Sequence, residues 1–310
     1  MRYDRTPSPQ LEALLAPGGF MAPLLEPRLV AGLPLDIHLR EKDHVHVYCG
    51  LTRLIDASLS QDGVKVSADS AYTQQQCAAG LFRRWSTTDA GFGDAVTKYL
   101  DAVVVNGSFV RSEGAVQAAW AAVRSPWIPF DREAVIGYGN TGQQTKGRKL
   151  SAVEMEAARE EIEALPKRRP WAQIPKNKVG AELDQLGVDP DGRLVLLELK
   201  DAGASPGSVF YAPLQLLQYV HEWARAYSTV RDQLESLIAA RVRLEMTPAN
   251  IPLPLRGGLR PVVGFGADTR STEVRARFDT VRAIVNRHLP AVASPMEAWV
   301  MENGKPVRLG

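Results

Sequence analysis

The sequence predicts an α/β protein, because its second half alternates helical and extended patterns while its first half opens with several short strands. In the second half, a helix is predicted at 151–165, followed by extended apolar segments near 171–174, 180–188 and 193–200. A second helix at 212–227 and a strand at 259–267 come next. This order predicts a core of helix, three-stranded antiparallel β-meander, helix and strand.

The chain of 310 residues has room for two domains. We predict an N-terminal α+β domain at 1–140 and a second domain at 141–310, with the polar, glycine-rich stretch 137–149 as a linker or mobile loop. In the first domain, residues 1–35 are expected to form a loosely ordered arm that packs on the rest. Three short strands over 36–68 include a hairpin at Gln61-Asp62-Gly63, and helices are predicted near 70–84, 94–104 and 113–124.

The second domain has clear boundary signals. Ser151 and Glu154 have the spacing of a capping box, which predicts that a helix starts there. Pro213 fits the first turn of the helix at 212–227. Further helices are predicted at 229–244 and 271–288. The dipeptide Asn303-Gly304 predicts a closing hairpin.

The segment 182–200, ELDQLGVDPDGRLVLLELK, is predicted to form a β-hairpin around the turn DPDG. A three-residue loop of Pro190, Asp191 and Gly192 would pair Asp189 with Arg193. Counting outward by equal steps, Asp184 falls opposite Glu198 and Glu182 falls opposite Lys200. Side chains opposite each other on one face have Cβ atoms about 4.5–5.5 Å apart.

Four charged side chains would therefore meet on one face of an otherwise apolar hairpin. Two carboxylates at this distance repel each other unless a cation lies between them. Mg²⁺ is suited to that position, because it prefers oxygen ligands. The alternative is a strand end with alternating charges that face solvent.

The residues Asp184, Glu198 and Lys200 resemble the motif of the PD-(D/E)XK nuclease superfamily, over roughly residues 150–310. The resemblance implies a restriction-endonuclease-like fold in which Asp184, Glu198 and the carbonyl of Leu199 bind Mg²⁺ or Mn²⁺. It also implies that Lys200 orients the attacking water. Leu183 precedes Asp184, so the proline that gives the family its name is absent.

Two further features extend the resemblance. Gln215 and Tyr219 lie four residues apart on the predicted helix and match the QxxxY arrangement of one branch of the superfamily, in which the glutamine assists the site. The alternative for this pair is packing on the sheet. The family also places a glutamate on the helix before the hairpin. Glu154, Glu156 and Glu161 are all candidates, and we take Glu154 as the candidate metal ligand although its capping role competes.

Basic residues precede the hairpin in the run KRRPWAQIPKNK, and basic side chains bind phosphates. The alternative is a solvated loop. The candidate nucleic-acid contacts are Lys167, Arg168, Arg169, Lys176, Lys178 and Tyr219.

Composition excludes several classes of protein. The net charge of +2 does not demand a nucleic-acid partner, and two cysteines do not make a disulfide scaffold. No apolar run reaches the about 20 residues of a membrane span, so we expect a cytoplasmic protein that does not enter the membrane. His44 and His46 alternate along one strand but lack the further ligands of a zinc site, so a plain strand face is expected there. No nucleotide-binding loop motif is present.

The resemblance therefore implies a Mg²⁺-dependent deoxyribonuclease with a role in bacterial DNA repair, restriction or anti-phage defence. RNA as the substrate, a homodimer and a protein partner that binds residues 1–140 are left open. The alternative function is a catalytically inactive module on the same fold that binds nucleic acid or protein.

Overall fold

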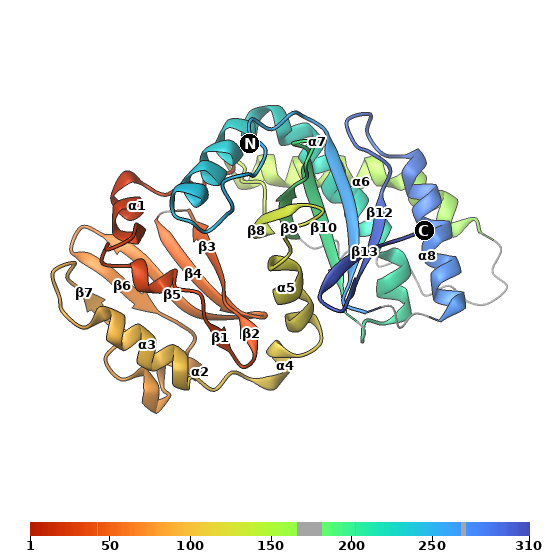
Figure 1. Ribbon diagram of the computed structural model, residues 1–310. Coiled ribbons are helices and arrows are strands. Elements are labelled where there is room, and N and C mark those ends of the chain that lie inside the picture. The colour runs from red at the N-terminus through yellow and green to blue at the C-terminus, as the bar shows by residue number, and fades with distance from the viewer. Residues whose placement is uncertain (42, 166–181, 202, 268–270) are drawn as a thin grey trace. The chain divides into compact units, whose positions relative to one another are not determined.

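The computed structural model describes residues 1–41, 43–165, 182–201, 203–267 and 271–310 (Figure 1). The chain divides into two compact units. The hairpin unit comprises residues 1–3, 123–232 and 251–310, and the N-terminal unit comprises residues 4–122 and 233–250. The predicted boundary after residue 140 therefore differs from the observed one. The reason is that strand β8 (Ile128–Ala134) pairs with the predicted hairpin and belongs to its sheet.

The hairpin unit is built on a six-stranded mixed sheet with the order β13-β12-β11-β10-β9-β8. Strand β11 runs parallel to both β10 and β12. The pairs β8–β9, β9–β10 and β12–β13 are antiparallel. The strands besides β8 are β9 (Leu183–Val188), β10 (Leu194–Lys200), β11 (Leu259–Phe265), β12 (Glu297–Glu302) and β13 (Lys305–Leu309). This arrangement confirms the predicted α/β class.

Along the described part of the chain, three helices alternate with the strands of this sheet. They are α6 (Thr141–Glu163), α7 (Pro206–Arg243) and α8 (Thr272–Arg287). Every residue of β11 is buried, as are Leu194 to Leu199 of β10. Continuous burial is typical of parallel strands covered on both faces, and it accounts for their nearly unbroken apolar sequences. Phe278 of α8 contacts Phe265 of β11, with ring centroids 5.4 Å apart, which places α8 against the sheet.

Helix α6 starts ten residues before its predicted position, so the linker predicted at 137–149 is wrong from Thr141 onward. Asn140 caps the helix, because its side chain accepts a hydrogen bond from the Gln143 amide at 2.9 Å. Ser151 lies inside the helix, where its hydroxyl donates to the carbonyl of Gly147. The predicted capping box of Ser151 and Glu154 therefore does not form, since a cap requires non-helical backbone at its first residue.

Helix α7 replaces the two helices predicted at 212–227 and 229–244. No glycine or proline separates the two predicted segments, so the helix continues through them. It begins at Pro206, where the hydroxyl of Ser205 accepts a hydrogen bond from the Ser208 amide. Pro213 consequently lies inside the helix and not in its first turn.

The order of elements also differs from the predicted one. The third strand of the antiparallel group is β8, which precedes α6 in the chain and pairs with β9 from Ile128↔Val188 to Ala134↔Leu183. The strand predicted at 171–174 lies outside the described residues. In the described part of the chain, the order is therefore strand, helix, two strands, helix and strand. The closing hairpin at Asn303-Gly304 is confirmed, with both residues at positive φ.

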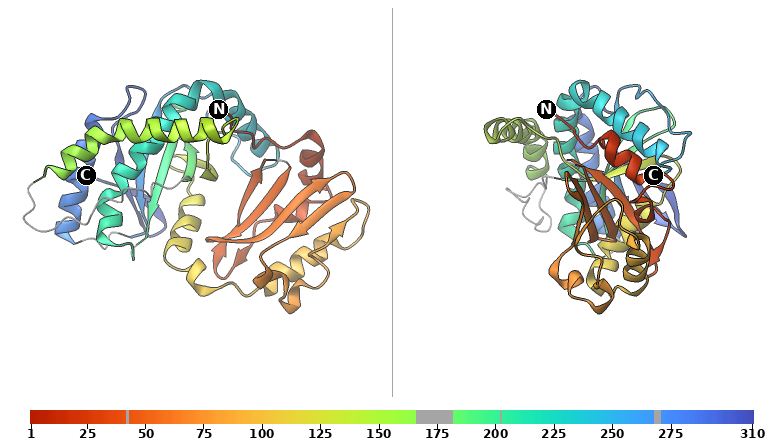
Figure 2. Two further views of the ribbon diagram at one scale, coloured as in Figure 1. Left: turned by 180° about the vertical axis from the view of Figure 1, so that it is seen from behind. Right: turned by 90° about the vertical axis from the view of Figure 1, so that its left-hand side faces the viewer.

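The N-terminal unit contains a five-stranded antiparallel sheet in the order β3-β4-β5-β6-β7, drawn in red to orange in Figure 2. Four strands replace the predicted three over 36–68, and the hairpin between Ser60 and Gly63 is confirmed. The strands are β3 (Asp36–Arg40), β4 (His44–Cys49), β5 (Thr52–Ser60), β6 (Gly63–Ser67) and β7 (Arg84–Trp85).

Short elements complete this unit. The arm predicted at 1–35 is ordered, since Leu11, Leu15 and Leu24 are buried. The helix predicted at 70–84 is replaced by two short helices and β7, because the backbone is extended at Gln75 and takes a positive φ at Gly80. The remaining elements are α1 (Pro9–Leu15), η1 (Ala22–Leu24), β1 (Leu29–Val30), β2 (Leu33–Pro34), α2 (Ser70–Thr73), η2 (Gln76–Ala78), α3 (Phe92–Ala102), α4 (Gly107–Val110) and α5 (Glu113–Ala121).

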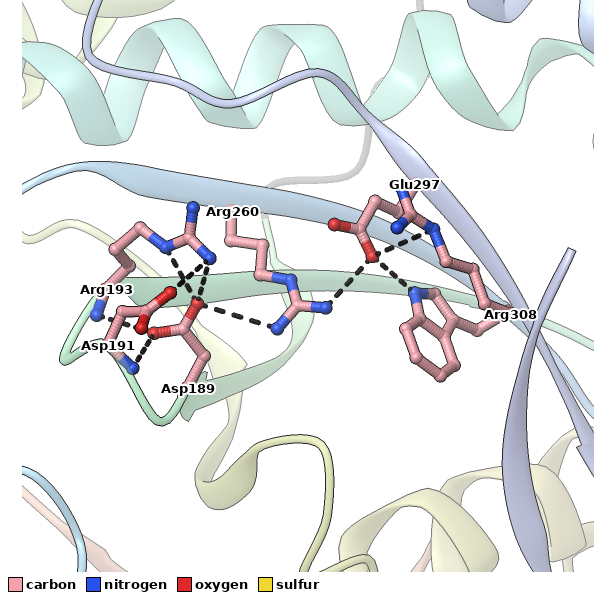
Figure 3. A network of polar contacts seen from close by, with 7 residues as sticks. Asp189, Asp191, Arg193, Arg260, Glu297 and Arg308 are labelled. Carbon is pink, nitrogen blue, oxygen red and sulfur yellow. Dashed lines mark hydrogen bonds and ion pairs between the residues drawn. The ribbon is translucent and has the colours of Figure 1, made fainter. Parts of the chain in front are cut away.

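A chain of polar contacts links the hairpin turn to β11 and β12 (Figure 3). Arg260 of β11 lies 3.5 Å from the Asp189 carboxylate and 3.0 Å from that of Glu297. Glu297 also accepts a hydrogen bond from the Trp299 indole at 2.7 Å. Arg260 lies beside the rings of Trp127 and Trp299, so its charge is enclosed by aromatic faces.

The lowered pKa of the Glu297 carboxyl group should make the stability of the folded protein depend on pH. Burial raises the pKa of its carboxyl group, but the hydrogen bonds from Arg260 and Trp299 and the charges of Arg260 and Arg308 together lower that pKa below its ordinary value. A lowered pKa in the folded state stabilises the protein above the unfolded-state pKa, and this contribution is lost as the pH falls through the folded-state pKa.

We expect Glu297→Gln to reduce the free energy of unfolding by about 1.5–3 kcal/mol at pH 7. The difference from the wild type should shrink as the pH is lowered from about 5 toward 3. Urea unfolding at a series of pH values measures it. A difference that stays constant over this range would show that Glu297 does not titrate with folding.

Candidate functional site

The hairpin turn forms as predicted. The Asp189 amide donates to the Arg193 carbonyl at 3.1 Å, and the Gly192 amide donates to the Asp189 carbonyl at 2.9 Å. Pro190, Asp191 and Gly192 therefore form the three-residue loop. Gly192 has φ of +79°, a conformation that glycine adopts without strain.

The register of the hairpin is also the predicted one. Regular pairing runs from Leu194↔Val188 to Leu197↔Gln185. The next step along both strands brings Glu198 opposite Asp184. The two acidic residues thus lie on adjacent strands at the end of the hairpin that is remote from the turn.

Asp184 marks the point where the regular ladder ends. Its Oδ2 accepts a hydrogen bond from the backbone amide of Leu199 at 2.6 Å. A side-chain oxygen of β9 therefore accepts a hydrogen bond from a backbone amide of β10, beyond the last regular pair of the two strands. This contact fixes the Asp184 carboxylate beside the Glu-Leu-Lys segment of β10.

Lys200 lies between two acceptors. Its Nζ donates to Oε1 of Glu198 at 2.6 Å and to Oε1 of Gln215 at 3.2 Å. The Glu198 side chain is 2% exposed and that of Lys200 is 12% exposed. Gln215 comes from α7, so the helix and the strand together hold the ammonium group. Such a charge-assisted contact is stronger than a neutral hydrogen bond.

Tyr219 lies one helical turn after Gln215 and is 1% exposed. Its hydroxyl donates to the carbonyl of Glu182 at 2.8 Å, which holds the start of β9 against α7. Burial raises the pKa of the Tyr219 phenol, and the charges of Glu198 and Asp184 raise it further. The burial of the ring agrees with the packing alternative, and contact of Tyr219 with a nucleic acid stays a prediction.

The three candidate glutamates of α6 have different surroundings. Glu154 is held by the guanidinium of Arg225 and lies 3.7 Å from Nδ1 of His221, both on α7. Glu161 contacts Arg287 and accepts from Nε2 of His288 at 2.6 Å. Glu156 is exposed. The contacts of Glu154 are to cationic and imidazole groups, so its carboxylate is neutralised by an arginine in this structure.

The structure thus brings together Asp184, Glu198, Lys200 and Gln215. The basic candidates Lys167, Arg168, Arg169, Lys176 and Lys178 lie outside the described residues. In the described part of the chain, no helix combines the length and apolar character needed to cross a membrane.

Sequence reasoning missed the residues that hold the candidate glutamate Glu154 and the hairpin turn. Arg225 stands 71 positions after Glu154, and Asp189 fixes the turn with its side chain. An Asp that directly precedes Pro-Asp-Gly could have been recognised as a side-chain acceptor for the turn amides. No comparable local signal points to Arg225.

The fold and the site together define a mixed α/β protein with a carboxylate and lysine cluster at one end of a buried hairpin. Comparisons with family models, with curated proteins and with solved structures each found no match. Membership of the PD-(D/E)XK superfamily and the restriction-endonuclease-like core therefore stay predictions.

Proposed function

We propose that this chain is a metal-dependent nuclease that hydrolyses phosphodiester bonds of DNA at the end of the β9–β10 hairpin. The observation that carries the proposal is the contact of Lys200 with both Glu198 and Gln215, with Asp184 fixed on the Leu199 amide. Carboxylates, a lysine and an amide from three separate elements converge here. A strand end that merely faces solvent has no need of this arrangement.

The donor set fits a hard divalent cation, because the two carboxylates supply oxygen atoms from neighbouring strands. Asp184 lies on the Leu199 amide and Glu198 lies on the Lys200 ammonium group, and these two residues would hold the ion. The carbonyl of Leu199 is a third proposed ligand. When bound, Mg²⁺ or Mn²⁺ would neutralise phosphate charge and lower the pKa of a water.

The protein groups then have distinct tasks. Lys200 holds a positive charge at the site, where it would stabilise negative charge that develops on the phosphate. Gln215 positions the Lys200 ammonium from α7. Asp184, bonded to the Leu199 amide, keeps the two strands in register at the site. Tyr219 anchors the start of β9.

The test is cleavage of single- and double-stranded DNA and of RNA in the presence of Mg²⁺ or Mn²⁺. We expect metal-dependent cleavage of DNA by the wild type and a loss of at least about 100-fold in Asp184→Asn. Asparagine still accepts a hydrogen bond from the Leu199 amide, so this variant removes the charge and keeps the fold.

Asp191→Asn is the matched control. It removes a carboxylate from the turn of the same hairpin, where Asp191 is exposed and pairs with Arg193 at 3.0 Å. This variant should cleave like the wild type. Undiminished cleavage by Asp184→Asn would refute the assignment of the site. Metal-independent binding of DNA without cleavage by the wild type would favour the inactive binding module.

A further inference from the structure

A second cluster of ligand-type side chains lies in the N-terminal unit, on the β3–β7 sheet. Strand β4 pairs with β5 so that His46 is directly opposite Asp56. His44 precedes His46 by two residues and therefore shares its face of the sheet. The turn between the two strands thus brings an acidic residue to a histidine pair that sequence reasoning regarded as a plain strand face.

The ligand atoms of the three residues are close together. Asp56 Oδ1 lies 2.9 Å from Nδ1 of His44, and Asp56 Oδ2 lies 3.6 Å from Nε2 of His46. One ligand atom from each residue lies within 4.8 Å of the others. Two ligands bound to one ion at about 2.0–2.2 Å stand roughly 3–3.5 Å apart, so a small adjustment suffices for all three to coordinate together.

The surroundings of His46 suit a metal ligand. The Tyr48 hydroxyl lies 3.2 Å from Nδ1 of His46. That contact fixes the orientation of the ring with Nε2 toward Asp56, as outer hydrogen-bond partners of metal-binding histidines do.

Arg53 lies at the same place. Its guanidinium is 3.5 Å from Nε2 of His46 and 3.6 Å from Oδ2 of Asp56. The Arg53 side chain is 46% exposed, and those of His44, His46 and Asp56 are 34%, 13% and 16% exposed. The ligands can therefore be reached from solvent. An ion would displace a flexible, half-exposed guanidinium, which holds the position in its absence.

We propose that His44, His46 and Asp56 form a binding site for a divalent transition-metal ion such as Zn²⁺. Two imidazoles and one carboxylate favour zinc, cobalt or nickel over Mg²⁺, which prefers oxygen ligands. Three protein ligands leave coordination positions for water. The site is independent of the proposed nuclease centre, since its residues and its preferred ion both differ.

The test titrates the full-length chain with Zn²⁺ by calorimetry and with Co²⁺ by visible absorption. We expect one equivalent to bind to the wild type and to Asp184→Asn, which lacks the candidate Mg²⁺ ligand. His44→Gln and Asp56→Asn should each bind at least about 10-fold more weakly. Arg53→Ala should bind more tightly, because the competing cation is gone. If the histidines and Asp56 do not bind a metal ion, Arg53→Ala should not increase the affinity for Zn²⁺.

His288→Gln is the matched control, since His288 also contacts a carboxylate, that of Glu161 at 2.6 Å, but does not belong to the three-ligand cluster found among the described residues. It should bind Zn²⁺ like the wild type. Thermal unfolding with and without Zn²⁺ checks that each variant folds, and the ion should raise the Tm of the wild type but not that of His44→Gln. Absence of binding to the wild type, or equal binding by His44→Gln and Asp56→Asn, would overturn the proposal.

Discussion

Lys200→Met is expected to destabilise the protein by about 3–5 kcal/mol, because it leaves a buried carboxylate without its cation. Methionine keeps the unbranched shape of the lysine side chain but donates no hydrogen bond to Glu198 or Gln215. The Glu198 side chain is 2% exposed, so water cannot replace the lost partner. The loss of stability reflects the burial of an unpaired charge on Glu198. It therefore exceeds the net contribution of the ion pair to stability.

The double variant Glu198→Gln/Lys200→Met separates these two quantities. It removes both charges, so no buried ion is left unpaired, and we expect it to recover at least half of the stability lost in Lys200→Met. Urea unfolding of the four members of the cycle, without added metal, measures the coupling. The double variant should nevertheless be inactive as a nuclease even when it is fully folded.

Lys305→Met is the control for the loss of a lysine as such, since Lys305 lies at an exposed position of β13. Its effect should stay within about 0.5 kcal/mol. If Lys200→Met costs no more than this control, the pair of Lys200 and Glu198 is not a stabilising feature of the buried strand. The fold would then not hold the lysine in place.

The hairpin could be predicted from sequence because its determinants are local. The DPDG turn defines a loop length, and loop length defines the register that aligns Asp184 with Glu198. Period two then decides which side chains share a face. The same holds for the Asn303-Gly304 turn, where both residues take positive φ.

The errors concern features that depend on distant residues. Strand β8 pairs with β9, although the whole of α6 separates the two strands along the chain. Nothing in the sequence of β8 identifies β9 as its partner. Gly142 and Gly147 made the start of α6 resemble a linker, although Asn140 caps a helix there. Tertiary packing overrides such weak local preferences.

The same distinction applies to single side chains. Glu154 was a candidate ligand by its position on a helix, but Arg225, far along the chain, neutralises it. Asp56 was missed because its relation to His46 exists only through the pairing of β4 with β5. Local patterns thus indicate which groups could act together, and the sheet register decides which of them meet.

The second large effect is expected at Asp189, where replacement by alanine should cost about 3–5 kcal/mol. The Asp189 side chain is 0% exposed. It accepts hydrogen bonds from the amides of Asp191 at 3.0 Å and Arg193 at 2.9 Å, and from Nε of Arg193 at 2.8 Å. Alanine leaves both turn amides without this acceptor and leaves Arg260 with Glu297 as its remaining ion-pair partner in the network of Figure 3.

Asp191→Ala is the matched control on the same turn. Its carboxylate is 73% exposed, so the loss of its contact with Arg193 should cost between 0 and about 1 kcal/mol. Asp189→Asn should fall between the two alanine variants, because the amide oxygen still accepts from the backbone while the charge is lost. Equal stability of Asp189→Ala and Asp191→Ala would show that the buried carboxylate does not hold the turn.

The register of β9 and β10 at the candidate site could be fixed by the turn or by the neighbouring strands. The nuclease activity of Asp189→Ala distinguishes these two cases. A slip of one residue would turn Asp184 to the other face of the sheet. However, β9 also pairs with β8 and β10 also pairs with β11, and both ladders constrain the hairpin independently of its turn. We therefore expect the cleavage rate of Asp189→Ala to fall in proportion to the unfolded fraction. A loss of cleavage in fully folded protein would instead assign the register to the turn.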